Sequence, residues 1–79
     1  MITLYSIEQG FYESDETDGI KWEYVCSLHN VKDAWTMSEE WTKEFHRPHR
    51  VMFNVYTTTN GGDILNKISG SIFHVALPE

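Results

Sequence analysis

Hydrophobic residues recur at helical spacing in one stretch of the chain, residues 30–46. On a helical wheel the apolar and small side chains gather on one side and the charged ones on the other. The apolar side comprises Val31, Ala34, Ser38, Trp41 and Phe45. The opposite side comprises Lys32, Asp33, Thr36, Glu39, Glu40, Lys43 and Glu44. We expect Ala34 and Ser38 to let the helix lie close on a sheet, with Trp41 and Phe45 as its large anchors.

Both ends of this helix are indicated by local sequence. Asn30 is a suitable N-cap, because its side-chain oxygen can accept a hydrogen bond from a free amide of the first turn. Asp33 places a carboxylate where the helix dipole is positive. Pro48 disfavours helical geometry at Arg47, so the helix should end near His46 or Arg47.

Alternation with a period of two predicts strands at residues 2–7, 20–26, 50–58 and 71–77. The first two should pair as a hairpin, because consecutive strands usually do. Asn60-Gly61-Gly62 predicts a turn, because Asn and Gly tolerate positive φ. Residues 63–70 fit either a helical turn or an extension of the last strand, and we favour the extension with Gly70 as a bulge. The side of the second strand expected to face the helix comprises Ile20, Trp22, Tyr24 and Cys26.

The order of elements predicts one α+β domain over residues 1–79, with ββαββ order, a four-stranded mostly antiparallel sheet and one helix packed on one face. The strands flanking the helix then form a βαβ unit. The other side of the sheet has no cover within the chain. Its expected residues are Tyr5, Ile7, Val25, Met52 and Tyr56. Such a face favours a dimer or a partner surface, although antiparallel sheets often leave a mixed face in water.

Twelve acidic and six basic residues give a formal net charge of −6. This balance disfavours binding to phosphate backbones, which requires a basic face. It is compatible with a basic protein partner, with mimicry of nucleic acid, or with solubility alone. Four of the acids form a block in residues 9–19, a predicted solvated loop. A single cysteine, no export signal and no apolar run of membrane-spanning length favour a cytoplasmic protein.

Residues able to carry catalysis or hold a metal are poorly represented. His46 and His49 have a metal-like spacing, but Pro48 lies between them and no further ligand completes a site. Cys26 shares an apolar strand face and is expected to be inert packing. We therefore expect no catalytic residue, metal or cofactor. The cationic segment 46–50 is a candidate for holding a phosphate or carboxylate, or for pairing with acids elsewhere in the chain.

Trp35 lies off the centre of the apolar helix side. It either completes the edge of the core or stays partly exposed as an anchor for a partner, since Trp is enriched among binding hot spots.

The order Asp33-Ala34-Trp35, Glu39-Glu40-Trp41 and then Arg47-Pro48-x-Arg50-Val51 resembles a pattern in small acidic bacteriophage-encoded accessory proteins. The resemblance covers about a third of the chain and carries over no functional residue. It implies an accessory phage protein that binds and alters a protein of the bacterial host.

The leading prediction is a non-enzymatic protein-binding module, phage or mobile-element encoded, that docks on a bacterial host protein through acids and an aromatic anchor. The expected partner-binding residues are Glu13, Asp15, Glu16, Asp18, Trp35, Glu39, Glu40 and Glu44. The alternatives are an acidic DNA mimic that blocks a nucleic-acid-binding protein, and a self-assembling module that uses the open face of the sheet.

Overall fold

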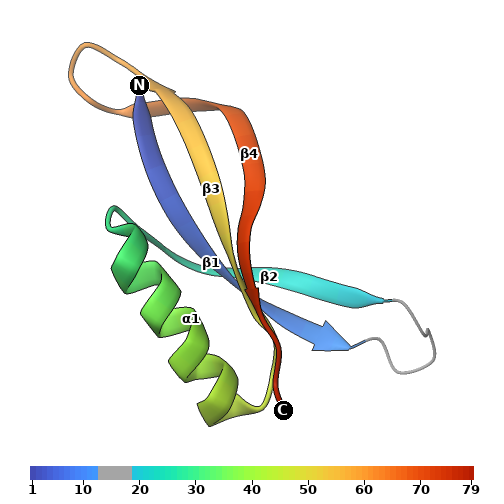
Figure 1. The fold of residues 1–79 in the computed structure, drawn as a ribbon. Helices are drawn as coiled ribbons and strands as arrows, with labels where there is room; N and C mark the ends of the chain where they lie inside the picture. Colours follow the sequence, from blue (N-terminus) through green and yellow to red (C-terminus); the bar gives the residue numbers. More distant parts are fainter. Residues whose placement is uncertain (13–18) are drawn as a thin grey trace.

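The computed structural model describes residues 1–12 and 19–79. Along this part of the chain one helix follows the first β-hairpin and precedes the second, and it packs on one side of the sheet (Figure 1). Strands β1 (Ile2–Tyr12) and β2 (Ile20–Leu28) precede α1 (Val31–Phe45), and β3 (His49–Thr58) and β4 (Ile64–Ala76) follow it. The sheet order is β2-β1-β3-β4, and every neighbouring pair is antiparallel. The α+β prediction with ββαββ order is confirmed. The strands of the βαβ unit, β2 and β3, run in the same direction with β1 between them.

The helix begins and ends where the local sequence predicts. The Asn30 side chain accepts hydrogen bonds from the backbone amides of Lys32 at 2.9 Å and Asp33 at 3.1 Å. At the other end His46 takes the left-handed conformation, with φ of 55°, and terminates the helix. Pro48 follows and is buried.

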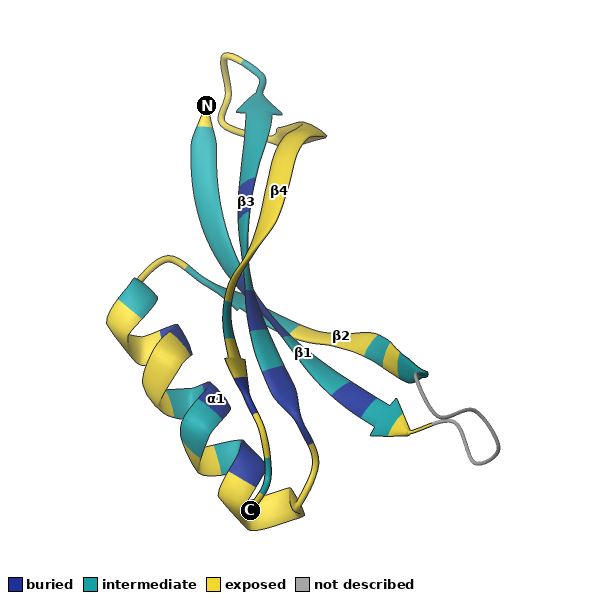
Figure 2. Cartoon of the chain, turned by 45° about the vertical axis from the view of Figure 1, so that its right-hand side comes forward, coloured by how far each residue is buried: buried dark blue, intermediate teal, exposed yellow. Residues whose placement is uncertain are grey.

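The core lies between α1 and the middle of the sheet, where Ile7, Ala34 and Val51 are fully buried. Half-buried side chains pack around them: Tyr5, Cys26, Leu28, Met37 and Trp41. Figure 2 shows the buried positions of the helix on its sheet-facing side. They are Ala34, Ser38 and Thr42, spaced four residues apart. The expectation that Phe45 anchors the helix is wrong, because half of its surface is exposed and Thr42 occupies the buried place on the last turns.

A β-bulge at Val25 reverses the side-chain alternation of β2. Ile7 pairs with Cys26, but the next residue, Glu8, pairs with Tyr24, which leaves Val25 as the extra residue. Cys26 therefore points to the helix side, as predicted, whereas Ile20, Trp22 and Tyr24 point to the other side of the sheet. Burial raises the pKa of the Cys26 thiol, in keeping with a packing role.

Only some of the residues predicted on the open side of the sheet lie there. Tyr5 and Ile7 belong to the helix side, where they contact the core. Met52 pairs with Ser6 and Tyr56 with Ile2, on the side away from α1. Polar groups occupy this side as well, because the Asn54 amide donates a hydrogen bond to Ser6 Oγ at 3.0 Å. A mixed face is the common state of an antiparallel sheet.

Strand β1 continues five residues beyond its predicted end, into the stretch expected to be a loop. The Arg50 side chain donates a hydrogen bond to the Glu8 carboxylate at 2.6 Å, and its guanidinium also lies 4.5 Å from the centre of the Trp22 ring. The Arg47 guanidinium lies 4.6 Å from the centre of the Phe11 ring. The cationic segment 46–50 is therefore divided among contacts within the chain rather than gathered into one anion site.

Residues 64–76 form one continuous strand, which confirms the extension that we favoured. The expected bulge at Gly70 is wrong, because Gly70 pairs regularly with Asn54, and the register shifts lie at Phe73, at Ile68 and between Lys67 and Ile64. A Cβ at Gly70 would lie 2.8 Å from Asn54 Oδ1, so the missing side chain makes room for that amide. The turn before the strand is the predicted one, with Gly62 at φ of 90°.

Candidate protein-binding surface

Trp35 stands on α1 with its ring held between two side chains of β4. Its ring stacks on the imidazole of His74, with centroids 3.6 Å apart and planes inclined by 15°. Its other contact is edge-to-face with Phe73, at a centroid separation of 5.9 Å. Trp35 and Phe73 remain 43% and 45% exposed. Trp35 therefore packs against β4 and stays partly exposed, and its role as an anchor for a partner stays a prediction.

The β4 bulge explains how two consecutive residues reach the same tryptophan. Val51 pairs with His74, and Met52 pairs with Ile72, so Phe73 is the extra residue between them. In a regular strand successive side chains point to opposite faces. The bulge lets both Phe73 and His74 contact Trp35 on the helix side. No local sequence signal marks this position, and neither residue is predicted from the sequence to be part of a site.

Glu39 fixes the orientation of the His74 ring. Its carboxylate accepts a hydrogen bond from His74 Nε2 at 2.7 Å, one helical turn beyond Trp35. The imidazole is thus held from one edge by Glu39 and across its face by Trp35. Such support lowers the entropy that the indole loses when a partner immobilises it.

A shallow apolar hollow of about 370 Å³ lies beside the Trp35 ring. Its lining residues are Val31, Lys32, Trp35, Thr36 and Phe73. We call Trp35, Phe73, His74, Glu39 and this hollow the Trp35 surface. An aromatic ring next to an apolar depression, with charged groups at the margin, is the usual composition of a protein-binding hot spot.

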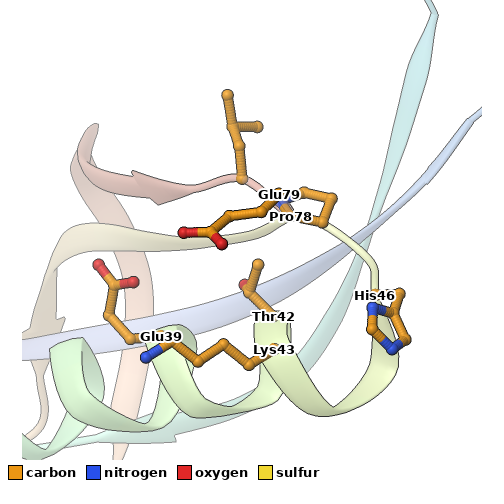
Figure 3. A pocket seen from close by; sticks show the side chains of 7 residues that line it. Glu39, Thr42, Lys43, His46, Pro78 and Glu79 are labelled. Atoms are coloured by element: carbon orange, nitrogen blue, oxygen red, sulfur yellow. The ribbon is translucent and has the colours of Figure 1, made fainter.

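A second hollow, of about 260 Å³, lies where the end of the helix meets the residues after β4 (Figure 3). Glu39, Thr42, Lys43 and His46 line it from the helix, and Leu77, Pro78 and Glu79 line it from the opposite wall. Its charged groups are of both signs. Within the described part of the chain, no three His, Cys, Asp or Glu side chains are grouped so as to hold a metal ion.

The three predicted partner-binding acids of α1 do not all lie on the side of the helix that carries Trp35. At about 100° of rotation per helical residue, Glu39 lies about 40° from Trp35, whereas Glu40 and Glu44 lie about 140° and 180° away. Among these three acids, only Glu39 belongs to the Trp35 surface. Glu13, Asp15, Glu16 and Asp18 lie outside the described residues.

His49 is a fully buried histidine whose environment favours the neutral ring. Nδ1 lies 3.0 Å from the Arg47 carbonyl oxygen and 3.1 Å from Thr42 Oγ1. A carbonyl oxygen only accepts, so Nδ1 carries the proton. Among the described residues Nε2 has no hydrogen-bond partner. Burial lowers the pKa of His49 despite the hydrogen bond to Arg47, which acts to raise it.

We expect acid to destabilise the protein through His49. Because the pKa in the folded state is lowered, the unfolded chain binds the proton more readily. The free energy of unfolding is therefore unaffected by the titration of His49 above the ordinary histidine pKa of 6.5. It decreases as the pH falls through 6.5 towards the lower pKa of the folded state. Urea unfolding of the wild type, His49→Gln and His46→Gln across this window measures the effect. A wild-type decline equal to that of His49→Gln would contradict the assignment, and the exposed His46 serves as the control.

No helix in the two described ranges is both long and apolar enough to cross a membrane. Comparisons of the chain with protein-family models, with curated proteins and with solved structures find no match.

Proposed function

We propose that this chain is a non-enzymatic protein-binding module that engages its partner through the Trp35 surface. The observation that carries the proposal is the half-exposed Trp35 ring, held in place by His74 and Phe73 beside an apolar hollow. Trp is the residue most enriched among binding hot spots, and a pre-oriented ring loses little entropy on binding.

The charge of the chain adds a second property of the partner. A net charge of −6 accelerates association with a basic surface and slows association with an acidic one. The partner that fits is therefore a protein with a basic surface and an apolar side chain that enters the hollow beside Trp35. The resemblance implies a phage protein that acts on a bacterial host protein, and this origin stays a prediction. Bacterial lysate is therefore the source in which to search for the partner.

Capture from bacterial lysate, followed by calorimetric titration of the purified partner, tests this function. We expect Trp35→Ala to weaken binding about 30-fold, the effect of losing one hot-spot aromatic. Phe45→Ala is the matched control, since Phe45 is a similarly exposed aromatic on the same helix and outside the Trp35 surface. Equal affinity of the wild type and Trp35→Ala would exclude the Trp35 surface. Failure to capture any protein would count against a binding module altogether.

A further inference from the structure

β4 forms one edge of the sheet, and β3 is its only strand neighbour among the described residues. One row of its backbone N–H and C=O groups therefore points away from the sheet. Figure 2 shows that the strand is exposed over most of its length. Six apolar side chains along it have between 40% and 58% of their surface exposed: Ile64, Leu65, Ile68, Ile72, Phe73 and Val75.

β4 carries few of the features that normally keep a sheet edge unpaired. Edge strands are usually short, carry charges or proline, or are twisted by bulges, and of these features β4 has the bulges. β4 has 13 residues, with no proline, no carboxylate and Lys67 as its one Lys or Arg residue. The opposite edge, β2, has 9 residues and carries Lys21 and Glu23.

We propose that β4 pairs antiparallel with β4 of a second copy of this chain about a two-fold axis, so that two four-stranded sheets become one continuous sheet. Two copies that each carry a charge of −6 repel least along a strand without carboxylates. A contact about a two-fold axis uses the same surface on both copies, so that surface must be complementary to itself. An apolar strand edge meets this condition. Pairing over residues 68–72, the part of β4 between its bulges, supplies about 5 backbone hydrogen bonds, and the exposed apolar side chains of the strand add buried area.

The full-overlap register places the two-fold axis at Gly70, the central residue of Ile64–Ala76. Ile68 of one copy then lies opposite Ile72 of the other. Ile72 pairs with Met52, on the side of the sheet away from α1. A change at Ile72 therefore leaves the Trp35 surface intact, and self-association is measured on the purified chain without any partner protein.

Sedimentation equilibrium tests the pairing with variants of opposite charge. The wild type is expected at twice the chain mass of 9.2 kDa. The double variant Ile68→Lys/Ile72→Lys and its counterpart Ile68→Glu/Ile72→Glu should each sediment at the chain mass, because like charges face each other. Their equimolar mixture should return to the doubled mass, because each lysine then lies opposite a glutamate. Val25→Lys, at an exposed position on β2, is the matched control and should stay at the doubled mass.

Hydrogen exchange of the wild type tests the same pairing without any substitution. Amides of β4 should gain protection as the protein concentration rises, whereas those of β2 should not. A wild type at the chain mass at every concentration would overturn the proposal. So would a double-lysine variant at the doubled mass, a mixture that stays at the chain mass, or β4 exchange that does not depend on concentration.

Discussion

Replacing Ile7 with alanine should lower the free energy of unfolding by about 3 kcal/mol, within the range measured for large apolar residues cut to alanine in protein cores. Ile7 is fully buried against Ala34 and Val51, so the change leaves a cavity between helix and sheet. A domain of 79 residues buries a smaller fraction of its surface than a larger domain does and has little stability in reserve. Urea denaturation at one fixed protein concentration measures the loss.

Leu77→Ala is the control for this prediction. Leu77 is 62% exposed and lies beyond the last residue of β4, so its truncation should change the stability by less than about 0.5 kcal/mol. Equal midpoints for Ile7→Ala and Leu77→Ala would mean that the core does not lie where the helix meets β1 and β3.

Replacing Gly10 with alanine should lower the free energy of unfolding by about 2 kcal/mol, the cost of an added methyl group in a closed space. A Cβ at Gly10 would lie 2.7 Å from Ile20 Cγ2 and from Pro48 Cγ, and 3.1 Å from Trp22 Cζ3. The Gly10 amide also donates a 2.8 Å hydrogen bond to the Pro48 carbonyl oxygen, which holds the backbone in place. The neighbouring chain segments must therefore move to admit the methyl group.

Gly61→Ala is the matched substitution in open space, because among the described residues its added Cβ has one neighbouring atom, Thr59 Oγ1 at 3.8 Å. Thermal unfolding monitored by circular dichroism should show a lower midpoint for Gly10→Ala and little change for Gly61→Ala. A Gly10→Ala variant as stable as the wild type would show that the segments around Pro48 and Ile20 are loosely packed.

The ends of the strands show how tertiary contacts override a local pattern. Glu8 and Gly10 resemble loop residues, because one is charged and the other is flexible. In the structure the Glu8 carboxylate is bound by Arg50, which is 42 positions away in the sequence, and Gly10 supplies the space that Pro48 needs. These contacts extend β1 beyond the end that its own residues indicate.

The candidate site depended on tertiary structure even more strongly. The sequence singled out Trp35 and Glu39, but it placed Glu40 and Glu44 with them on the strength of charge alone. Phe73 and His74 hold Trp35 in place. A bulge brings them to it, and the position of this bulge depends on how β4 pairs with β3. A bulge reverses the alternation that strand prediction relies on, and cross-strand pairing decides where it falls.

The sequence by itself determined the elements whose causes are local. Asn30 caps the helix through amides two and three residues away, Pro48 limits its far end, and Asn60-Gly61-Gly62 turns the second hairpin. Only the tertiary structure decided the strand order, the bulges at Val25 and Phe73, and the surface around Trp35. The physical reason is the distance along the chain over which each feature is decided, because the hydrogen bonds of caps and turns form within a few residues. Register and burial instead depend on side chains that meet only when the chain is folded.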